Sequence, residues 1–337
     1  MSEVVVITGA SAGLGRAIAE RFADAGARIG LIARGRERLE AARADVESRG
    51  GTGLVLPLDV ADAEAVDRAA SRVEQELGPI DVWINNAMTS VFSPAEQMHA
   101  DEYRRVTEVN YLGFVHGTLA ALARMRPRDR GVIIQVGSAL AHRSIPLQSA
   151  YCASKHAIKG FTESLYTELL HERTQVRVTM VDMPAMNTPQ FDWVKSRLPH
   201  RAQPVPPIFQ PEVGAEAVHY AAHHDCGPEL LVAWPTLKAV IGEKFVDGYI
   251  NRRLARTGFD SQQTDEPARD RPDNLWEPVP GDWAAHGRFG DRARDFSAEF
   301  WVRTHRELLA VGAAGAPGLL LGAFTGRPQP ARSSEPH

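Results

Sequence analysis

The sequence predicts an α/β fold built on a doubly wound, mostly parallel β-sheet. Short aliphatic runs alternate with helix-periodic segments from residue 4 to residue 232, which is the pattern of repeated strand–helix units. The aliphatic runs are apolar on both faces, as a sheet covered by two helix layers requires. A glycine-rich turn separates the first run, residues 4–7, from the first helix. Together these features indicate a parallel sheet whose ligand site lies at the carboxyl ends of its strands.

The individual elements follow from hydrophobic period and from breakers. Strands are expected at residues 4–7, 28–33, 53–58, 80–84, 132–136, 177–181 and 229–232. Helices are expected between the glycine turn and Gly26, and at residues 36–48, 63–77, 101–124, 150–172 and 212–223.

The glycine turn is the first candidate binding site. Gly9, Gly13 and Gly15 lie between a strand and a helix, so backbone N–H groups and a helix N-terminus face the position of a bound phosphate. Glycine also permits close backbone approach and tight strand–helix packing. Ser11 and Leu14 belong to the same loop. In this context a dinucleotide site is a better interpretation than a simple turn.

The end of the second strand indicates which dinucleotide is bound. An acidic side chain there would bind the ribose 2′-OH of NAD, whereas arginine suits the 2′-phosphate of NADP. The chain has Ala33 followed by Arg34 and no carboxylate. NADP is therefore predicted, the alternative being a solvated Arg34 before an exposed helix.

Polar residues also follow the third and fourth strands. Asp59-Val60 and Asn85-Asn86-Ala87 stand just past the ends of their strands, at the edge where such sheets bind ligands. Asp and Asn are common turn formers, so each alone would be unremarkable. In combination they predict an adenine contact from Asp59 and cofactor support from Asn86.

A tyrosine and a lysine one helical turn apart are the candidate catalytic pair. Tyr151 and Lys155 occupy positions i and i+4 of the helix at 150–172, so both face one point. A cation about 4 Å away would lower a phenol pKa by roughly 3 units, to near 7. Such a phenol exchanges protons with an alcohol or ketone oxygen. A lone match of this kind is more often a packed ring beside a solvated charge.

Two further polar residues extend the candidate site. Ser138 follows the carboxyl end of the strand expected at 132–136 and could donate a hydrogen bond to the substrate oxygen beside Tyr151. Asn110 lies in the middle of the helix at 101–124, although Asn is a mediocre helix former. It has either a hydrogen-bonding duty at a packed interface or a satisfied place in the core.

Composition limits the alternatives. The chain of 337 residues has a formal net charge of −4, so nothing suggests a nucleic-acid partner. Cys152 and Cys226 are its two cysteines; their spacing forms neither a metal motif nor a disulfide framework, which favours a reducing, cytoplasmic location. No signal peptide is expected before the first strand.

The motifs in this order and spacing resemble the short-chain dehydrogenase/reductase family, of the roughly 250-residue type, over about residues 2–234. The resemblance implies a Rossmann fold. It also implies that Tyr151 is the general acid/base and that Ser138 polarises the substrate oxygen. Lys155 would lower the Tyr151 pKa and hold the nicotinamide ribose. Asn110 would anchor a water that links Lys155 to solvent, and such enzymes commonly pair through the helices that carry Asn110 and Tyr151.

The chain departs from the family pattern at two places. Met183-Pro184 stands where Pro-Gly is usual, although Thr188 is retained and would contact the carboxamide or the pyrophosphate. Ala12 stands where many NADP-using members have a basic residue, so 2′-phosphate recognition would depend chiefly on Arg34.

The chain is expected to divide into a dehydrogenase domain at residues 1–234, an extension at 235–325 and a disordered tail at 326–337. A substrate loop at 185–211 carries Phe191, Trp193 and Phe209; these aromatics either meet an apolar or bulky ligand or tuck into the core. In the extension, helices are expected at 237–256 and 298–309. The uncharged stretch 308–324 is expected to dock on the protein or to be disordered rather than to enter a membrane.

Two functions are consistent with the sequence. The first is an NADP(H)-dependent oxidoreductase that acts on a secondary alcohol or ketone, and the resemblance implies that it forms a homo-oligomer. The second is a nucleotide-sensing or scaffold protein that binds a partner through its C-terminal extension. The intact set of Asn110, Ser138, Tyr151 and Lys155 favours the enzyme.

Overall fold

Residues 2–305 are described in the computed structural model of the chain, apart from the side chains of residues 239–247. The chain divides into two units, one ending at Ser297 and one beginning at Ala298. Residues 235–297 of the predicted extension therefore belong to the same compact unit as the sheet. The uncharged stretch 308–324 and the predicted tail at 326–337 lie outside the described residues.

Seven parallel strands form the central sheet, in the order β12-β7-β6-β4-β1-β2-β3. The order reverses at β1, as it does in a doubly wound sheet, so the predicted fold class is confirmed. The inner strands β1, β4, β6 and β7 consist almost entirely of buried residues because helices cover both faces of the sheet. The strands are β1 (Val4–Thr8), β2 (Arg28–Ala33), β3 (Thr52–Pro57), β4 (Val82–Asn85), β6 (Gly131–Ser138), β7 (Val176–Met183) and β12 (Glu229–Leu231).

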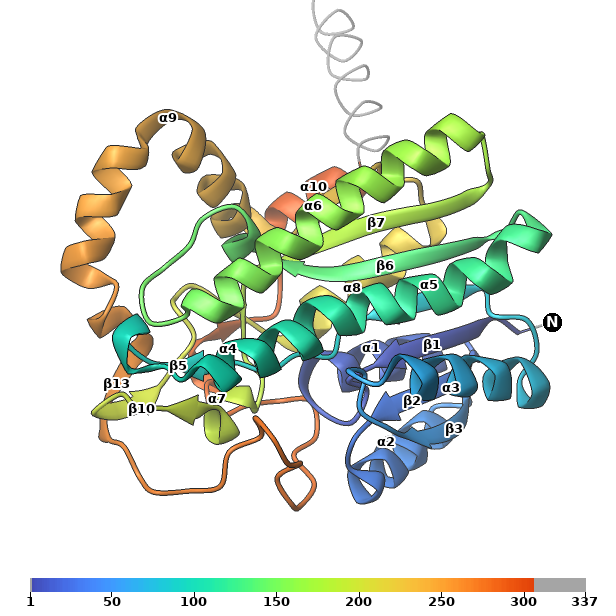
Figure 1. Cartoon of the computed structure of the whole chain (residues 1–337), viewed down its shortest axis with the longest axis horizontal. Helices are drawn as coiled ribbons and strands as arrows, with labels where there is room; N and C mark the ends of the chain where they lie inside the picture. The colour runs from blue at the N-terminus through green and yellow to red at the C-terminus, as the bar shows by residue number, and fades with distance from the viewer. Residues whose placement is uncertain (1, 306–337) are drawn as a thin grey trace, which may run out of the picture. The chain divides into compact units, whose positions relative to one another are not determined.

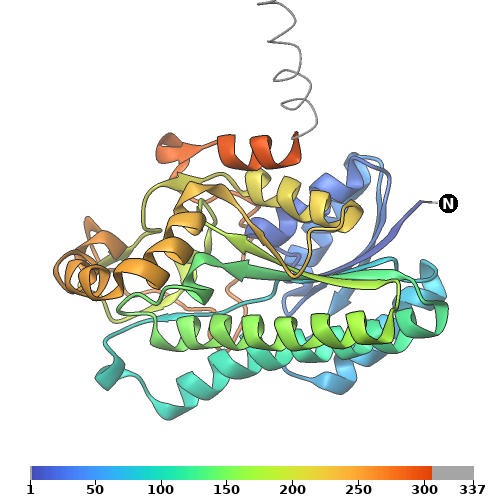
Figure 2. The same ribbon diagram turned by 90° about the horizontal axis from the view of Figure 1, so that it is seen from above.

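Helices lie in two layers, one on each face of the sheet (Figures 1 and 2). One layer holds α1 (Gly13–Ala23), α2 (Arg36–Ser48) and α8 (Pro211–His223). The other holds α3 (Ala63–Glu76), α4 (Ala100–Thr107), α5 (Gly113–Met125) and α6 (Ser149–Glu172). In the second layer Val73, Ala121 and Leu169 belong to one core cluster with Trp83 of β4. The apolar stripe of each helix thus meets the sheet, as its period predicts.

The remaining elements are short, apart from α9 (Ala233–Thr257). They are β5 (Val91–Phe92), α7 (Gln190–Trp193), β8 (Ala185–Met186), β9 (Lys195–Ser196), β10 (His200–Ala202), β11 (Ile208–Phe209), β13 (Gln263–Pro267), β14 (Ala293–Arg294) and α10 (Ala298–Thr304). Single helical turns are η1 (Ala95–Gln97), η3 (Arg126–Arg128), η4 (Ala139–Ala141), η5 (Asp260–Gln262) and η6 (Gly290–Arg292). Among the described residues, no helix is both long and apolar enough to span a membrane.

The helix predicted at 101–124 is not continuous. Residues Glu108–Leu112 form a π-helical turn, η2, between α4 and α5. Asn110 at its centre is fully buried and exchanges hydrogen bonds with the backbone of Thr89, at 2.8 and 3.0 Å. A π-turn inserts one residue into the helical ladder, and here it turns the Asn110 amide toward that loop. The helix prediction was therefore wrong at this point, because a tertiary contact overrides the local period.

The extension up to Ser297 folds back on the substrate loop, within the same unit as the sheet. Its strand β13 pairs antiparallel with β10, and β14 pairs parallel with β11. Between these strands lies the segment 271–289, called the arm below. Leu275 of the arm is fully buried in a cluster with Val91, Val106 and Ala150, so the arm is anchored by packing as well as by polar contacts.

Candidate functional site

The carboxyl ends of the sheet strands open into one cavity of about 410 Å³. Its walls include residues from β2, β6 and β7 and residues that directly follow β1 and β4, so it lies at the edge that the topology predicts. Of the predicted site residues, those that line it are Gly9, Ser11, Gly13, Leu14, Gly15, Arg34, Asp59, Val60, Asn86, Ala87, Ser138, Tyr151, Lys155 and Thr188. Asn110 does not line it.

The glycine turn is packed so closely that side chains are excluded. A Cβ at Gly15 would lie 2.2 Å from the Gly9 carbonyl oxygen and 2.6 Å from Asn86 Nδ2. Asn86 donates from Nδ2 to the Thr8 carbonyl at 3.0 Å, and Thr8 Oγ1 accepts the backbone N–H groups of Asn86 and Ala87. Asn86 thus holds the glycine turn through hydrogen bonds to Thr8. The outer side of the turn faces the cavity, which fits a bound pyrophosphate.

Tyr151 lies in the cavity wall with Ser138 beside it. The Ser138 side chain hydrogen-bonds the phenol and lowers its pKa, but burial dominates and the pKa of Tyr151 is raised well above 10. The negative charge of Asp182 adds to the rise. The prediction of a phenol pKa near 7 is therefore wrong for the protein without its cofactor, because desolvation of the phenolate outweighs the neighbouring charges.

Lys155 has the predicted place but is held by the backbone of β6. Its Nζ donates to the Val136 carbonyl at 2.7 Å and lies 5.6 Å from the centroid of the Tyr151 ring. Only 2% of its surface is exposed. Burial lowers the pKa of Lys155 to about 8, against the attraction of Asp182. The pair of side chains predicted one turn apart on α6 is therefore adjacent in the structure.

Asn110 connects α6 to the loop after β4. Besides the Thr89 backbone, its Nδ2 donates to Ser154 Oγ at 3.1 Å, and Ser154 stands next to Lys155 in α6. The sequence left two roles open for Asn110, a satisfied amide in the core or a hydrogen-bonding duty at a packed interface. The structure shows both, because the amide is fully hydrogen-bonded in the core and also contacts the helix that carries Tyr151 and Lys155.

Arg34 is at the predicted place but is engaged by the arm. Its guanidinium donates to the carbonyl oxygen of Trp276 at 2.6 Å and to that of Asn274. Burial, together with the charge of Arg105, lowers its pKa. No local sequence pattern predicts these partners, because Asn274 and Trp276 lie more than 200 positions after Arg34.

Arg38 is a cavity residue that sequence reasoning missed. It has 8% of its surface exposed and lies in the cavity wall, with its guanidinium carbon 5.3 Å from the Trp193 ring centroid. Within residues 2–305, no hydrogen-bond acceptor or carboxylate pairs with that guanidinium. Asp282 and Glu37 attract the guanidinium without pairing with it, and its place in the cavity wall fits an anionic group of the cofactor. The signal available in the sequence was a second arginine four residues after Arg34.

Asp59 also has a partner that the sequence did not indicate. Its Oδ2 accepts from Arg105 at 2.5 Å and its Oδ1 accepts from the Ala61 backbone at 3.0 Å. Burial would raise the pKa of Asp59, but these hydrogen bonds outweigh burial and lower it. The carboxylate stays ionised and fixed at the cavity edge. Arg105 also donates to the Leu275 carbonyl of the arm at 3.0 Å.

The arm reaches the glycine turn itself. The Gly13 backbone N–H donates to the Ala284 carbonyl at 2.9 Å, and Arg16 in α1 pairs with Asp282 at 2.7 Å. Trp283 meets Trp193 edge to face, with ring centroids 5.2 Å apart. Trp276 and Trp283 stand in an otherwise polar and proline-rich segment of the sequence, and large apolar side chains in such a segment are a signal for an ordered arm.

The other half of the cavity is mainly apolar. Phe191 and Trp193 line it and are also buried, so they pack in the core, and their contact with a ligand stays a prediction; Phe209 is buried and does not line it. Gln148 lines the cavity, with its Nε2 donating to Gln262 at 2.7 Å. Further apolar lining residues are Phe92, Leu140, Ile145, Met186 and Val205, with prolines at 184, 204, 206, 207 and 235.

A comparison with protein families decides the class of the chain. The family model described as "short chain dehydrogenase" matches residues 3–197. The chain belongs to the short-chain dehydrogenase/reductase family. It is an NAD(P)-dependent oxidoreductase of that family.

Relatives of known name agree with this assignment. An uncharacterized oxidoreductase, YxnA, of Bacillus subtilis is 31% identical over 81% of this chain and 77% of that protein. A fatty acyl-CoA reductase of Acinetobacter baylyi is 33% identical over 65% of this chain and 72% of that protein.

Solved structures of other short-chain dehydrogenase/reductases are similar to this one. The alcohol dehydrogenase of the archaeon Thermococcus sibiricus, complexed with 5-hydroxy-NADP, has a TM-score of 0.60 at 28% identity and covers 69% of this chain and 96% of its own. A metagenomic short-chain oxidoreductase in complex with NADP has a TM-score of 0.58 at 29% identity, over 68% of this chain and 96% of its own.

Proposed function

We propose that the protein is an NADP(H)-dependent oxidoreductase that transfers a hydride between nicotinamide and a secondary alcohol or ketone, with Tyr151 as general acid/base. The observation that carries the proposal is the common cavity. Tyr151, Ser138 and Lys155 line the same space as the glycine turn, so a proton-transferring group and a dinucleotide site meet there.

The chain's own residues then have distinct roles. When bound, the nicotinamide supplies or accepts the hydride. Tyr151 donates its proton to the carbonyl oxygen, and its raised pKa keeps it protonated at neutral pH, which favours ketone reduction. Ser138, which hydrogen-bonds the phenol, helps to orient the substrate oxygen and stabilises the phenolate. Lys155 in its charged form opposes the cost of that phenolate.

Asn110 would support a proton route to the site. Its amide fixes the Thr89 loop and Ser154 beside Lys155. We assign it the anchoring of a water that reprotonates Tyr151 through Lys155, by the family resemblance. Thr188 and Asn86, both in the cavity wall, would hold the nicotinamide half of the cofactor.

NADP is the proposed cofactor because the site offers two arginines and no acid after β2. Arg34 and Arg38 both line the cavity, and Arg38 has a free guanidinium within the described chain. A 2′-phosphate is the group of the dinucleotide that matches them. Two structural relatives are complexes with NADP or a derivative of it, which supports the same choice.

The substrate is proposed to be apolar. The half of the cavity away from the glycine turn is lined by aliphatic, aromatic and proline side chains, and such a surface favours a ligand with an extended apolar part. The named Acinetobacter baylyi relative acts on fatty acyl-CoA, and a long-chain carbonyl compound would suit this cavity. A cytoplasmic location remains a proposal that rests on cysteine content.

The test is turnover by Tyr151→Phe against a panel of aliphatic and aromatic ketones, followed by NADPH absorbance. The variant should lose roughly a thousandfold or more of kcat, since general acid catalysis contributes about 10² to 10⁴. Its NADPH Kd should stay within about twofold of the unmodified protein, because a single hydroxyl is removed from a large site. A variant that kept most of its rate would exclude the proposed role of Tyr151.

A further inference from the structure

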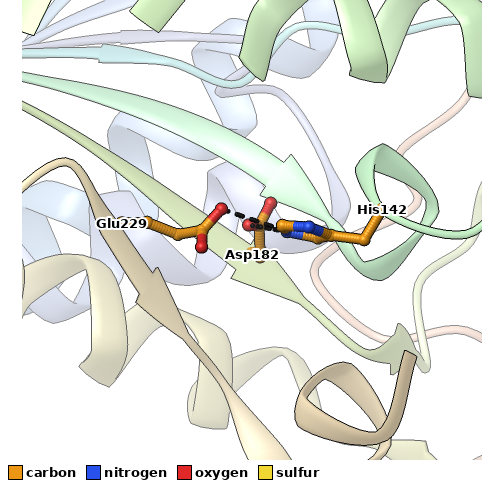
Figure 3. A group of neighbouring side chains, drawn as sticks. All are labelled: His142, Asp182 and Glu229. Atoms are coloured by element: carbon orange, nitrogen blue, oxygen red, sulfur yellow. Dashed lines mark hydrogen bonds and ion pairs between the residues drawn. The ribbon is translucent and has the colours of Figure 1, made fainter. Parts of the chain in front are cut away.

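The side chains of one histidine and two carboxylates, His142, Asp182 and Glu229, lie together in the structure (Figure 3). His142 comes from the turn after β6, Asp182 from the end of β7 and Glu229 from the start of β12. His142 Nε2 lies 3.0 Å from Asp182 Oδ2 and 3.0 Å from Glu229 Oε1. Asp182 is fully buried, so this cluster is part of the protein interior and not a solvated ion pair.

The Asp182 carboxylate holds both ends of one short turn. Its Oδ1 accepts the backbone N–H of Ser138 at 2.8 Å, and its Oδ2 faces His142. Ser138 and His142 flank the single helical turn η4, which Ser138 caps by accepting the Leu140 N–H on its hydroxyl at 3.1 Å. One carboxylate therefore holds Ser138 against β7, in addition to the β6–β7 strand register.

The backbone of β6 is shaped to admit that carboxylate. Gly137 pairs with Asp182 in the sheet register, and a Cβ at Gly137 would lie only 2.0 Å from Asp182 Oδ1. No side chain fits at that position without moving the carboxylate. The glycine before the catalytic serine thus has a specific steric reason in this chain.

The cluster also acts on the catalytic groups by charge. The Asp182 charge raises the pKa values of both Tyr151 and Lys155. Burial would lower the pKa of His142, but Asp182 and Glu229 raise it to about 9, so the imidazole is cationic at neutral pH. On α6 the cluster also faces Lys159, whose Nζ lies 3.2 Å from Glu229 Oε1; Lys159 in turn pairs with Glu163 at 2.5 Å.

We propose that Asp182 and His142 are positioning residues for proton transfer at Tyr151, an inference that rests on the proposed function. Asp182 fixes Ser138 through its backbone N–H. The His142 imidazolium fixes Asp182 and offsets the negative charge that Asp182 places near the phenol. Neither residue touches the substrate or lines the cavity, so both act through Ser138 and Tyr151.

A divalent cation is the other occupant that one imidazole and two carboxylates could bind. The three ligand atoms lie within 4.8 Å of one another. However, the Glu229 oxygen that faces His142 already has the Lys159 ammonium at 3.2 Å. That contact favours a hydrogen-bonded cluster over a metal site.

The experiment compares Asp182→Asn, Asp182→Ala and His142→Asn with the control His223→Asn. His223 is a matched control because it also pairs with a carboxylate, Glu3 at 3.5 Å, and does not line the cavity. Circular dichroism and thermal unfolding verify folding.

Asp182→Asn keeps an acceptor for the Ser138 N–H, so kcat should fall less than in Asp182→Ala, where a loss of roughly a hundredfold is expected. The NADPH Kd should change by less than about twofold in all of them.

The pH profile separates positioning from mere support of the fold. In the unmodified protein kcat should decline as pH rises through about 8, where Lys155 loses its proton, and again through about 9, where His142 does. His142→Asn should keep the step at about 8, lack the step at about 9 and run at a lower kcat throughout, whereas His223→Asn should keep both steps. An unchanged profile in His142→Asn, or a kcat that chelation abolishes and added zinc restores, would overturn the proposal.

A readout without turnover distinguishes failure of this inference from failure of the proposed function. The ultraviolet absorbance of the Tyr151 phenolate is obtained by subtracting the Tyr151→Phe titration from that of each protein. Asp182→Asn should ionise Tyr151 at lower pH than the unmodified protein, because a nearby negative charge is removed. His142→Asn should not shift this titration by charge, because His142 has already lost its proton above about pH 9. If the Asp182→Asn shift appears in a protein that reduces no carbonyl compound, the proposed function fails and the coupling stands. If Asp182→Asn leaves the titration unchanged, the inference fails even in an active enzyme.

Discussion

The backbone N–H of Gly13 donates a 2.9 Å hydrogen bond to the carbonyl oxygen of Ala284. Ala284 adopts φ = 49°, in the left-handed region that non-glycine residues rarely enter. Two residues earlier, Asp282 pairs with Arg16, a side chain of α1 that is almost fully buried. The glycine turn is therefore bonded to the C-terminal extension, which makes the arm a structural part of the cofactor site.

Asp282→Ala should weaken NADPH binding. The ion pair with Arg16 fixes the arm, and the arm contributes Asn274 and Pro278 to the cavity wall. Loss of one charge-assisted hydrogen bond costs about 1.5–3 kcal/mol, part of which would appear as a rise in Kd of roughly threefold to tenfold. Fluorescence titration of NADPH measures the change.

The matched control for the arm is Asp291→Ala, an exposed acid of the same extension that does not line the cavity. It should leave the NADPH Kd unchanged. Tighter NADPH binding by Asp282→Ala would mean that the arm competes with the dinucleotide for its site.

Arg38→Ala should reduce the preference for NADP over NAD. Arg34 has its guanidinium occupied by carbonyl groups of the arm, whereas Arg38 is free within the described chain and lines the cavity. A phosphate contact of about 1.5–3 kcal/mol corresponds to roughly a tenfold to hundredfold rise in the NADPH Kd. The NADH Kd should stay nearly constant, as measured by parallel fluorescence titrations.

Arg34→Ala should also lose the preference for NADP, and in addition it should lower the unfolding temperature, because it releases the arm as well as a cation. Equal affinity of the unmodified protein for NADPH and NADH would contradict the assignment of both arginines.

Local patterns were sufficient to predict the framework of the site. The strand, glycine turn and helix at residues 4–23 are consecutive in the chain, and Tyr151 and Lys155 are related by one turn of a helix. Strand ends in a parallel sheet share one edge, so Asp59, Asn86 and Ser138 were predicted to converge without any distance being known.

The remaining features depend on contacts between distant segments. The partners of Arg34 are more than 200 positions away, and no spacing rule connects them. The pKa of Tyr151 was mispredicted because burial of the phenol is set by the surrounding cavity walls and not by the helix that carries it. The π-turn at Asn110 likewise arises from the Thr89 loop, which period analysis of the helix cannot include.

Stability should fall in alkaline solution because of His142. Its pKa is about 9 in the folded protein against 6.5 as a reference. The resulting stabilisation is fully present below pH 6.5 and is lost as pH rises through 9, by an amount on the order of 2 kcal/mol. Urea unfolding of the unmodified protein at pH 6.5, 8 and 9.5 would measure it. His142→Asn should flatten this dependence, and an equally steep decline in that variant would assign it to other groups.

Leu119→Glu should convert a dimer into a monomer. Pairing of two copies through α5 and α6 is a prediction from family resemblance, and these helices present apolar side chains to solvent in the isolated chain. Leu112 is 38% exposed, Leu119 56% and Leu170 60%. Leu112 and Leu119 are seven positions apart and so share a helical face. A charge on that face would be desolvated in a dimer, at a cost of several kcal/mol.

Light scattering after size-exclusion chromatography gives the mass of the Leu119→Glu variant and of the unmodified protein. Tyr249→Glu, at an exposed site on α9, should leave the mass unchanged, and a monomeric unmodified protein would refute the pairing.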